Sequence, residues 1–249
     1  MVKEKLGDRL AEGKTKVIYA HPTDSALVYM VHKDSISAGD GARRNVIVGK
    51  GALSCHTTSN VFRALERAGI LTHFVAEIDD TTMLVRACKM IPLEVVMRRI
   101  ATGSYLKRHP EVSEGTRFEG PLVEFFLKDD ANHDPFITPA AIETAGIASA
   151  EEVQAMTDTG RRTFEVMEAA WAAQNVTLVD MKIEFGRDVE GTLLVADVID
   201  NDSWRIWPEG QRGKMLDKQI YREMPEVDAD GLNLILAKYQ QVAALTEKF

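Results

Sequence analysis

Residues 178–186 read LVDMKIEFG, and the prediction of the fold starts from this stretch. Apolar and charged side chains alternate through it, which is the pattern of a β-strand with one apolar and one charged face. A second strand-like run follows at 192–199 after a short turn, so the two runs predict a hairpin. That hairpin would place Glu184 and Asp197 roughly opposite one another, close enough to share a divalent cation, with Lys182 beside them. The alternative is an exposed surface strand without a ligand.

Another strand is predicted at 92–100, where apolar residues share one parity and Glu94 and Arg98 share the other. The Gly103-Ser104 pair after it is typical of a helical turn, whose free N–H groups attract anions. A forked guanidinium and a hydroxyl suit a phosphate monoester, so Arg98 and Ser104 predict a phosphate site. The alternative is a charged strand that simply runs into a turn.

Two short β-rich runs near the N-terminus, 14–20 and 26–32, predict a further hairpin. It begins with EGKTK at 12–16, which contains the Gly-Lys-Thr of a Walker A loop. The comparison fails, because Gly7 lies one residue too far away and a strand, rather than a helix, follows. A glycine turn inside a hairpin can still bring N–H groups and two lysines over a triphosphate. A solvated lysine turn explains the same residues equally well.

The rest of the chain mixes helices and strands without a repeat. A capping box of Ser149 and Glu152 marks the start of a long helix, whose apolar stripe we assign to core packing. The remaining elements are helices at 51–68, 214–224 and 229–247, strands at 71–78 and 82–90, and a long loop at 109–139. This mixed order predicts an α+β protein with two lobes, a β-rich one over 1–90 and an α+β one over 91–249.

Three further segments carry polar groups whose role the residues alone leave open. The turn at 37–43 presents Asp40, and the loop at 128–135 clusters charge with His133, which lacks metal-ligand spacing. Arg205 lies between two tryptophans shortly after the predicted hairpin, where it can reach the same pocket or pack in a corner.

The composition favours a globular protein that binds small molecules. A net charge of −8, with 45% hydrophobic and 27% charged residues, argues against a broad nucleic-acid or membrane surface. Cys55 and Cys88 have no CxxC or histidine spacing, so zinc sites and a disulfide framework are unsupported. The first residues lack an apolar signal core, and no run approaches the roughly 20 apolar residues of a membrane span. We therefore expect a cytoplasmic protein.

Taken together, these segments resemble successive signatures of the SAICAR synthetase family, in family order across most of the chain. The matching segments are 13–16, 37–43, 92–104, 128–135 and 180–186. The blocks at 92–104 and 180–186 are the most specific. The resemblance implies a two-lobed fold related to ATP-grasp enzymes and protein kinases, with the nucleotide in the cleft between the lobes.

The resemblance also implies ATP and Mg²⁺ as cofactors and assigns roles to residues at matching positions. The implied ATP-binding residues are Gly13, Lys14, Lys16 and, beside adenine, Met90. The implied residues for the phosphorylated substrate are Glu94, Arg98, Ser104 and Arg205. The implied metal ligands are Glu184 and Asp197, and the implied catalytic residues are Lys182 at the phosphates and Asp40, Lys128 and Asp134 around the reaction centre.

The implied reaction is an ATP-dependent ligation of L-aspartate to a carboxylated aminoimidazole ribonucleotide, through an acyl phosphate, in purine biosynthesis. A small-molecule kinase and a non-catalytic nucleotide sensor are the rival hypotheses. Val198 stands where many bacterial members have an acidic residue, a form similar to the synthetase half of the animal bifunctional enzyme. At 249 residues we expect the synthetase activity alone. The sequence leaves open whether the chain forms a homo-oligomer.

Overall fold

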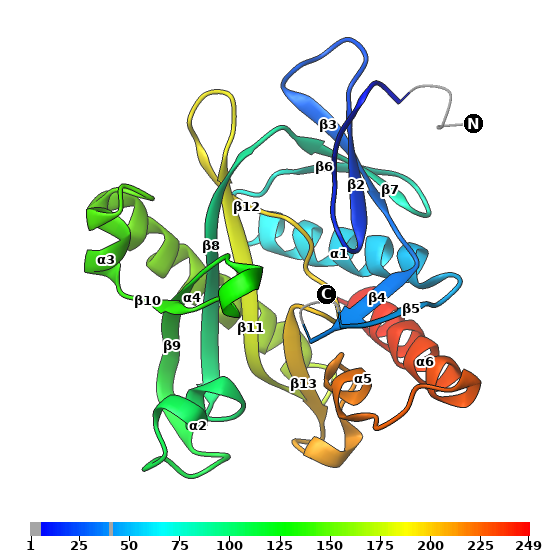
Figure 1. The fold of residues 1–249 in the computed structure, drawn as a ribbon, viewed down its shortest axis with the longest axis vertical. Helices are drawn as coiled ribbons and strands as arrows, with labels where there is room; N and C mark the ends of the chain where they lie inside the picture. The colour runs from blue at the N-terminus through cyan, green and yellow to red at the C-terminus, as the bar shows by residue number, and fades with distance from the viewer. Residues whose placement is uncertain (1–5, 40–41) are drawn as a thin grey trace.

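The computed structural model describes residues 6–39 and 42–249 and is a mixed α/β structure, as predicted. Its N-terminal part is an antiparallel sheet with the strand order β1-β2-β3-β7-β6. The strands are β1 (Arg9–Glu12), β2 (Lys16–Ala20), β3 (Leu27–His32), β6 (Phe74–Asp79) and β7 (Thr82–Arg86). Figure 1 shows this sheet at the top of the molecule. The predicted N-terminal hairpin is confirmed as β2 paired with β3.

A second sheet has the order β10-β9-β8-β11-β12, with β13 paired to the other half of β11. Its strands are β8 (Lys89–Ile100), β9 (Arg117–Leu127), β10 (Phe136–Ile137), β11 (Val176–Arg187), β12 (Leu193–Ala196) and β13 (Trp204–Pro208). The long strands β8 and β11 run side by side down the molecule (Figure 1). Their predicted alternation is confirmed, because Leu93, Val95 and Met97 are fully buried.

Of the three long helices in the described residues, α1 (Lys50–Arg67) packs on the N-terminal sheet, α4 (Ala150–Ala172) packs on the second sheet and α6 (Ala229–Thr246) packs on α1. The shorter helices are α2 (Ser104–Arg108), α3 (Pro139–Thr144) and α5 (Gln219–Glu223). A small hairpin, which consists of β4 (Ser35–Ala38) and β5 (Arg43–Val46), forms a third sheet. The capping box at Ser149 and Glu152 starts α4, as predicted. Among the described residues, no helix is long and apolar enough to cross a membrane.

Helix α4 packs on the apolar face of β8, β9 and β11. A Cβ on Gly160 would lie 3.2 Å from the sulfur of Met97 and 3.3 Å from a methyl group of Val95, so this glycine lets the helix approach the sheet closely. The core continues into the N-terminal sheet, since Phe62 and Met83 belong to the same apolar cluster. The apolar side of β8 and β11 is thereby filled, which leaves their polar side for a ligand.

The predicted loop at 109–139 is wrong, because it contains the eleven-residue strand β9. Gly120 and Pro121 gave the signal of a turn. They lie where the register between β8 and β9 shifts, in an irregular part of the strand that tolerates a residue without an N–H group. β10 pairs only with Phe125 and Phe126, so it does not extend over the proline.

Two other predictions need correction. The predicted helix at 214–224 is reduced to α5. Residues 212–214 form a separate 3₁₀ turn, and the chain is extended at Met215, between this turn and α5. The strand at 82–90 is two strands, β7 and the beginning of β8, separated at residues 87–88. The division into lobes at residue 90 stays a prediction.

Candidate functional site

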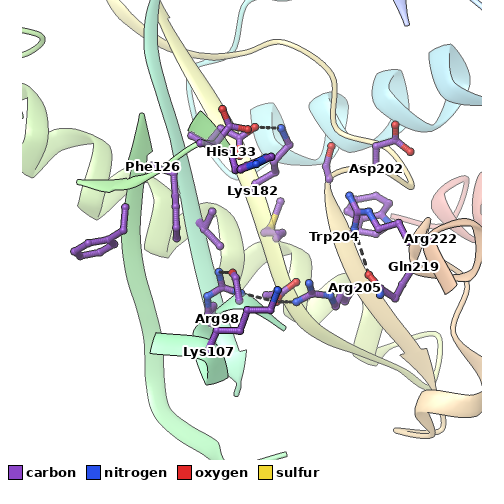
Figure 2. Close-up of a pocket in the computed structure, with 18 of the residues that line it drawn as sticks. Arg98, Lys107, Phe126, His133, Lys182, Asp202, Trp204, Arg205, Gln219 and Arg222 are labelled. Carbon is purple, nitrogen blue, oxygen red and sulfur yellow. Dashed lines mark hydrogen bonds and ion pairs between the residues drawn. The ribbon is translucent and has the colours of Figure 1, made fainter. Parts of the chain in front are cut away.

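Two adjoining cavities open on the polar side of β8 and β11. The first has a volume of about 690 Å³ and the second about 710 Å³. Five residues line both cavities: Glu94, Asp134, Lys182, Asp202 and Arg222. Figure 2 shows the first cavity, with Lys182 at one end and Arg98, Lys107 and Arg205 at the other. A ligand that spans both cavities would pass these shared side chains.

The register of β8 and β11 explains why the polar residues meet. Glu94 lies opposite Glu184, and Arg98 lies opposite Asp180. Directly opposed residues of an antiparallel pair point to the same face, so each strand contributes alternate polar side chains to one surface. The ammonium group of Lys182 lies between the carboxylates, paired with Glu94 and 3.8 Å from Glu184 Oε1.

An arginine centre lies at one end of the first cavity; we define it as Arg98, Arg108 and Arg205 with the carboxylates of Asp180 and Glu124. Arg98 donates through Nε to Glu124 at 2.6 Å and through Nη1 to Asp180 at 2.9 Å. Arg205 donates to the same oxygen of Asp180 at 2.5 Å, and Arg108 pairs with Glu124. Two buried carboxylates therefore hold three guanidinium groups together.

Ser104 and Gly103 complete this end of the cavity. The guanidinium of Arg98 lies 3.3 Å from the Ser104 hydroxyl, so the predicted pair is brought together. Gly103 has a φ of 60°, and a Cβ there would lie 2.5 Å from a nitrogen of Arg205. Glycine is required for both reasons, since the conformation is left-handed and the guanidinium occupies the space.

A lysine centre borders the second cavity; we define it as Lys16, Lys128 and Lys182 with the carboxylates of Glu94, Glu184 and Asp197. Lys128 Nζ lies 2.6 Å from Glu184 Oε2, and Lys16 pairs with Asp197. Burial by itself would raise the pKa of the Glu184 carboxyl, but the surrounding lysine charges outweigh burial and lower it. Burial lowers the pKa of the Lys16 ammonium to about 8. The centre therefore places the ionised Glu184 carboxylate beside closely spaced lysine side chains.

The predicted metal pair is adjacent in space, one residue away from the predicted register. Glu184 lies opposite Ala196, and Asp197 is the next residue. Within residues 6–39 and 42–249, no group of three or more histidine, cysteine or acidic side chains is arranged to hold a metal. Two carboxylates fit magnesium, which commonly binds through one or two of them together with substrate phosphates.

The structure gathers most of the predicted site residues around the two cavities. Those that line them are Gly13, Lys14, Lys16, Glu94, Arg98, Ser104, Lys128, Asp134, Lys182, Glu184, Asp197 and Arg205. Met90 lines neither of the two; it lies opposite Gly186 and is 40% exposed. Asp40 lies outside the described residues. The roles of all these residues stay predictions.

Sequence reasoning missed several residues that line or support the cavities. They are Arg108, Glu124, Asp202, Lys218 and Arg222. Asp202 accepts hydrogen bonds from Lys218 Nζ and from the Tyr239 hydroxyl, both at 2.7 Å. Lys218 and Arg222 are four residues apart in a segment predicted as helical. This spacing places them on one face of a helix, so the sequence could have identified them as a pair.

Comparisons with known proteins find similarity over nearly the whole chain. A sequence profile described as SAICAR synthetase matches residues 9–234. Phosphoribosylaminoimidazole-succinocarboxamide synthase of Roseiflexus castenholzii is 62% identical over 242 residues, 97% of each chain. Multifunctional protein ADE2 of Gallus gallus is 46% identical over 98% of this chain and 59% of its own length. A solved structure, SAICAR synthetase (Type-2) in complex with ADP, has a TM-score of 0.85 and 31% identity over 95% of this chain and 96% of that one.

Proposed function

Because the chain belongs to the SAICAR synthetase family, we propose that it joins L-aspartate to a carboxylated aminoimidazole ribonucleotide with ATP as the energy source. The products are SAICAR, ADP and phosphate, and the step belongs to purine biosynthesis. The name of the Roseiflexus relative supports this ligase activity, and the ADP in the related solved structure supports the use of ATP.

The observation that carries the proposal is the pairing of two different cationic centres along one pair of strands. The arginine centre suits a fixed phosphate monoester, because forked guanidinium groups bind its oxygens with defined geometry. The lysine centre suits a triphosphate with a metal ion, because it combines mobile ammonium groups with carboxylates. Lys182 and Glu94 line both cavities, so the reacting groups of the two substrates would meet there.

ATP would occupy a cleft between the two lobes, in an arrangement related to ATP-grasp enzymes and protein kinases. The turn between β1 and β2 supports this placement. Gly13 donates its N–H to the main-chain oxygen of Lys16 at 2.9 Å, and Gly13, Lys14 and Lys16 all line the second cavity. Met90 would lie beside the adenine at the boundary of the lobes.

The chemistry would proceed in two displacements. An oxygen of the imidazole carboxylate attacks the γ-phosphorus of ATP, ADP leaves and an acyl phosphate forms. The amine of L-aspartate then attacks the acyl carbon, phosphate leaves with its electron pair and the amine gives up a proton. Lys182 would neutralise the transferring phosphoryl group, while Arg98, Ser104 and Arg205 hold the ribonucleotide phosphate in register.

The remaining predicted residues would surround the reaction centre. Magnesium, held by Glu184 and Asp197, would supply charge neutralisation at the triphosphate. The charges of Lys182 and Lys128 lower the pKa of the Glu184 carboxyl against the effect of burial, and Lys128 Nζ lies 2.6 Å from it. Asp134 lines both cavities. Asp40 is proposed for the same centre from the sequence alone.

A coupled assay with ATP, L-aspartate and the carboxylated ribonucleotide, with each omitted in turn, tests the proposal. We expect ADP release and amide formation to require all three. A small-molecule kinase would release ADP without L-aspartate, and a nucleotide sensor would bind ATP without releasing ADP. Either of those outcomes would contradict the proposed ligation.

A further inference from the structure

Asp197 has a main-chain conformation that most residues avoid. It follows directly after β12 with a φ of 68°, in the left-handed region. Its carboxylate nevertheless lies in the second cavity and pairs with Lys16. A residue other than glycine keeps such a conformation where surrounding contacts impose it. The segment that precedes β6 supplies contacts of this kind.

Residues 71–73 run beside the end of β12. The N–H of His73 donates to the main-chain oxygen of Val195 at 2.9 Å, and the N–H of Val195 donates to that of Leu71 at 3.1 Å. The imidazole of His73 reaches further along the chain, where its Nε2 lies 3.1 Å from the main-chain oxygen of Asp197. Because a carbonyl oxygen only accepts hydrogen bonds, Nε2 is the protonated nitrogen of this ring.

The imidazole is itself held in place. His73 is 2% exposed, and its ring meets the ring of Phe62 edge-on, with centroids 5.2 Å apart. Its main-chain oxygen accepts the N–H of Arg86 at 2.7 Å, which fixes the residue against β7. The donor that reaches Asp197 therefore comes from a buried residue directly before β6, which is hydrogen-bonded through its main chain to both β7 and β12.

We propose that His73 is a positioning residue that fixes the main chain of Asp197 and thereby aims its carboxylate at the metal and nucleotide. This inference rests on the proposed function, which assigns Asp197 to magnesium. The carbonyl and the carboxylate of one residue turn together when φ changes. Losing the hydrogen bond from His73, which we call the tether, would therefore let Asp197 relax away from the left-handed region. Glu184, on the neighbouring β11, is held on both sides, since it pairs with Glu94 of β8 and with Ala196 of β12.

The test compares His73→Leu with His73→Gln. The amide nitrogen of glutamine sits about as far from the main chain as Nε2 of histidine and also donates, whereas leucine fills the space without donating. We measure manganese binding in the presence of a non-hydrolysable ATP analogue by paramagnetic resonance, together with kcat and the KM of each substrate. His73→Leu should weaken manganese binding by roughly tenfold or more, the size seen when groups that orient metal ligands are removed. His73→Gln should recover most of that loss.

Thr72→Val provides a matched control. Thr72 is equally buried in the same bridge to β12, but its hydroxyl donates to Glu66 at 2.9 Å instead of contacting Asp197. This variant should lose stability to thermal unfolding while binding manganese as the parent does. If His73→Leu does not fold, His73→Asn replaces it, because the shorter amide cannot reach the carbonyl, and the same weakening is expected.

The outcomes separate the tether from the function on which it rests. Asp197→Asn is measured in parallel and should abolish tight manganese–nucleotide binding. If Asp197→Asn weakens binding but His73→Leu matches the parent, the tether is wrong and the metal site stands. If His73→Gln is as weak as His73→Leu, hydrogen-bond donation is not the reason and the tether is also wrong. If Asp197→Asn binds manganese as the parent does, the metal assignment itself is overturned.

Discussion

The arginine centre and the lysine centre lie along the same two strands, yet their charges are held in different ways. In the arginine centre, Arg98 is 4% exposed and donates to two buried carboxylates as well as to Ser104. In the lysine centre, the side chains of Lys128 and Lys182 are 41% and 35% exposed. Arg98 is fixed by several hydrogen bonds, whereas Lys128 and Lys182 are partly exposed side chains that pair with carboxylates.

This difference indicates what each centre has to do during the reaction. A guanidinium locked by carboxylates on one side is already oriented for a phosphate that stays in place throughout. An ammonium group on a flexible stem can leave its carboxylate when a triphosphate and a metal ion arrive. Changes in the lysine centre should therefore affect turnover, and changes in the arginine centre should affect substrate binding and the stability of the empty protein.

The largest expected effect follows removal of a carboxylate from the lysine centre. Glu184→Gln or Asp197→Asn should reduce kcat by roughly 100-fold to 1,000-fold, because charge at the transferring phosphoryl group is no longer neutralised. The free energy of unfolding should change much less, because Lys128, the partner of Glu184, is 41% exposed and stays solvated. Lys16, the partner of Asp197, can give up its proton, since its pKa is already lowered to about 8. Initial rates and urea unfolding measure the two quantities. A variant that turns over at the parental rate would contradict the assignment of that carboxylate.

The next effect tests the arginine centre. Arg98→Ala should raise the KM of the ribonucleotide by about tenfold to 100-fold, because a charged phosphate contact is worth about 1.5–3 kcal/mol. The KM of ATP should stay within about threefold of the parental value. Arg99→Ala is the matched control, since Arg99 is adjacent on β8 but pairs at 2.6 Å with Glu168 of α4, on the opposite face. Equal weakening of ATP and ribonucleotide by Arg98→Ala would show that the two centres are not separate.

Local patterns were enough to predict the polar faces of these strands. Alternation in 92–100 and 178–186 predicted which side chains share a surface, and the hairpin prediction placed Glu184 and Asp197 within one residue of opposite positions. Alternation works here because both strands have one filled apolar face, which fixes the orientation of every side chain. The left-handed conformation of Asp197 has no signal in the sequence, because aspartate adopts both extended and left-handed conformations.

The missing parts of the prediction depend on contacts between distant segments. Glu124 was overlooked because Gly120 and Pro121 made β9 resemble a loop, so its register with β8 could not be considered. Arg108 reaches Glu124 only once α2 folds back beside β9. No sequence periodicity relates residues that lie in different segments. The pairing of the strands and helices has to be known before such residues can be recognised as one centre.

A buried carboxyl beside the arginine centre should make the stability of the empty protein depend on pH. Asp217 is 3% exposed behind Arg205, and burial raises the pKa of its carboxyl to about 6, although the N–H groups of Ile206 and Gln219 donate to it. The native state therefore binds this proton more tightly than the unfolded chain, where the pKa is 3.8. As pH rises from about 3 to 7, the free energy of unfolding should fall by as much as about 3 kcal/mol.

Asp217→Asn tests this expectation because asparagine does not titrate. Urea unfolding of parent and variant is measured across the same pH range. The altered hydrogen bonds can lower the free energy of unfolding of the variant by the same amount at every pH. As pH rises through this range, however, the variant should gain stability relative to the parent. Parallel curves for the two proteins would contradict a raised pKa of the Asp217 carboxyl in the native state.

The smallest expected effect is the loss of the Ser104 hydroxyl. Ser104→Ala removes one neutral hydrogen-bonding group, worth about 1 kcal/mol, so the KM of the ribonucleotide should rise by roughly threefold to tenfold and the KM of ATP should not change. Thr102→Val is the control, because the Thr102 hydroxyl donates to Glu114 at 2.9 Å, outside the first cavity.

Arg98 and Ser104 are in direct contact at 3.3 Å, so their effects should not add. The double variant should therefore lose less ribonucleotide affinity than the two single losses predict. Full additivity would mean that the two groups bind the substrate independently and that the arginine centre is looser than its contacts indicate.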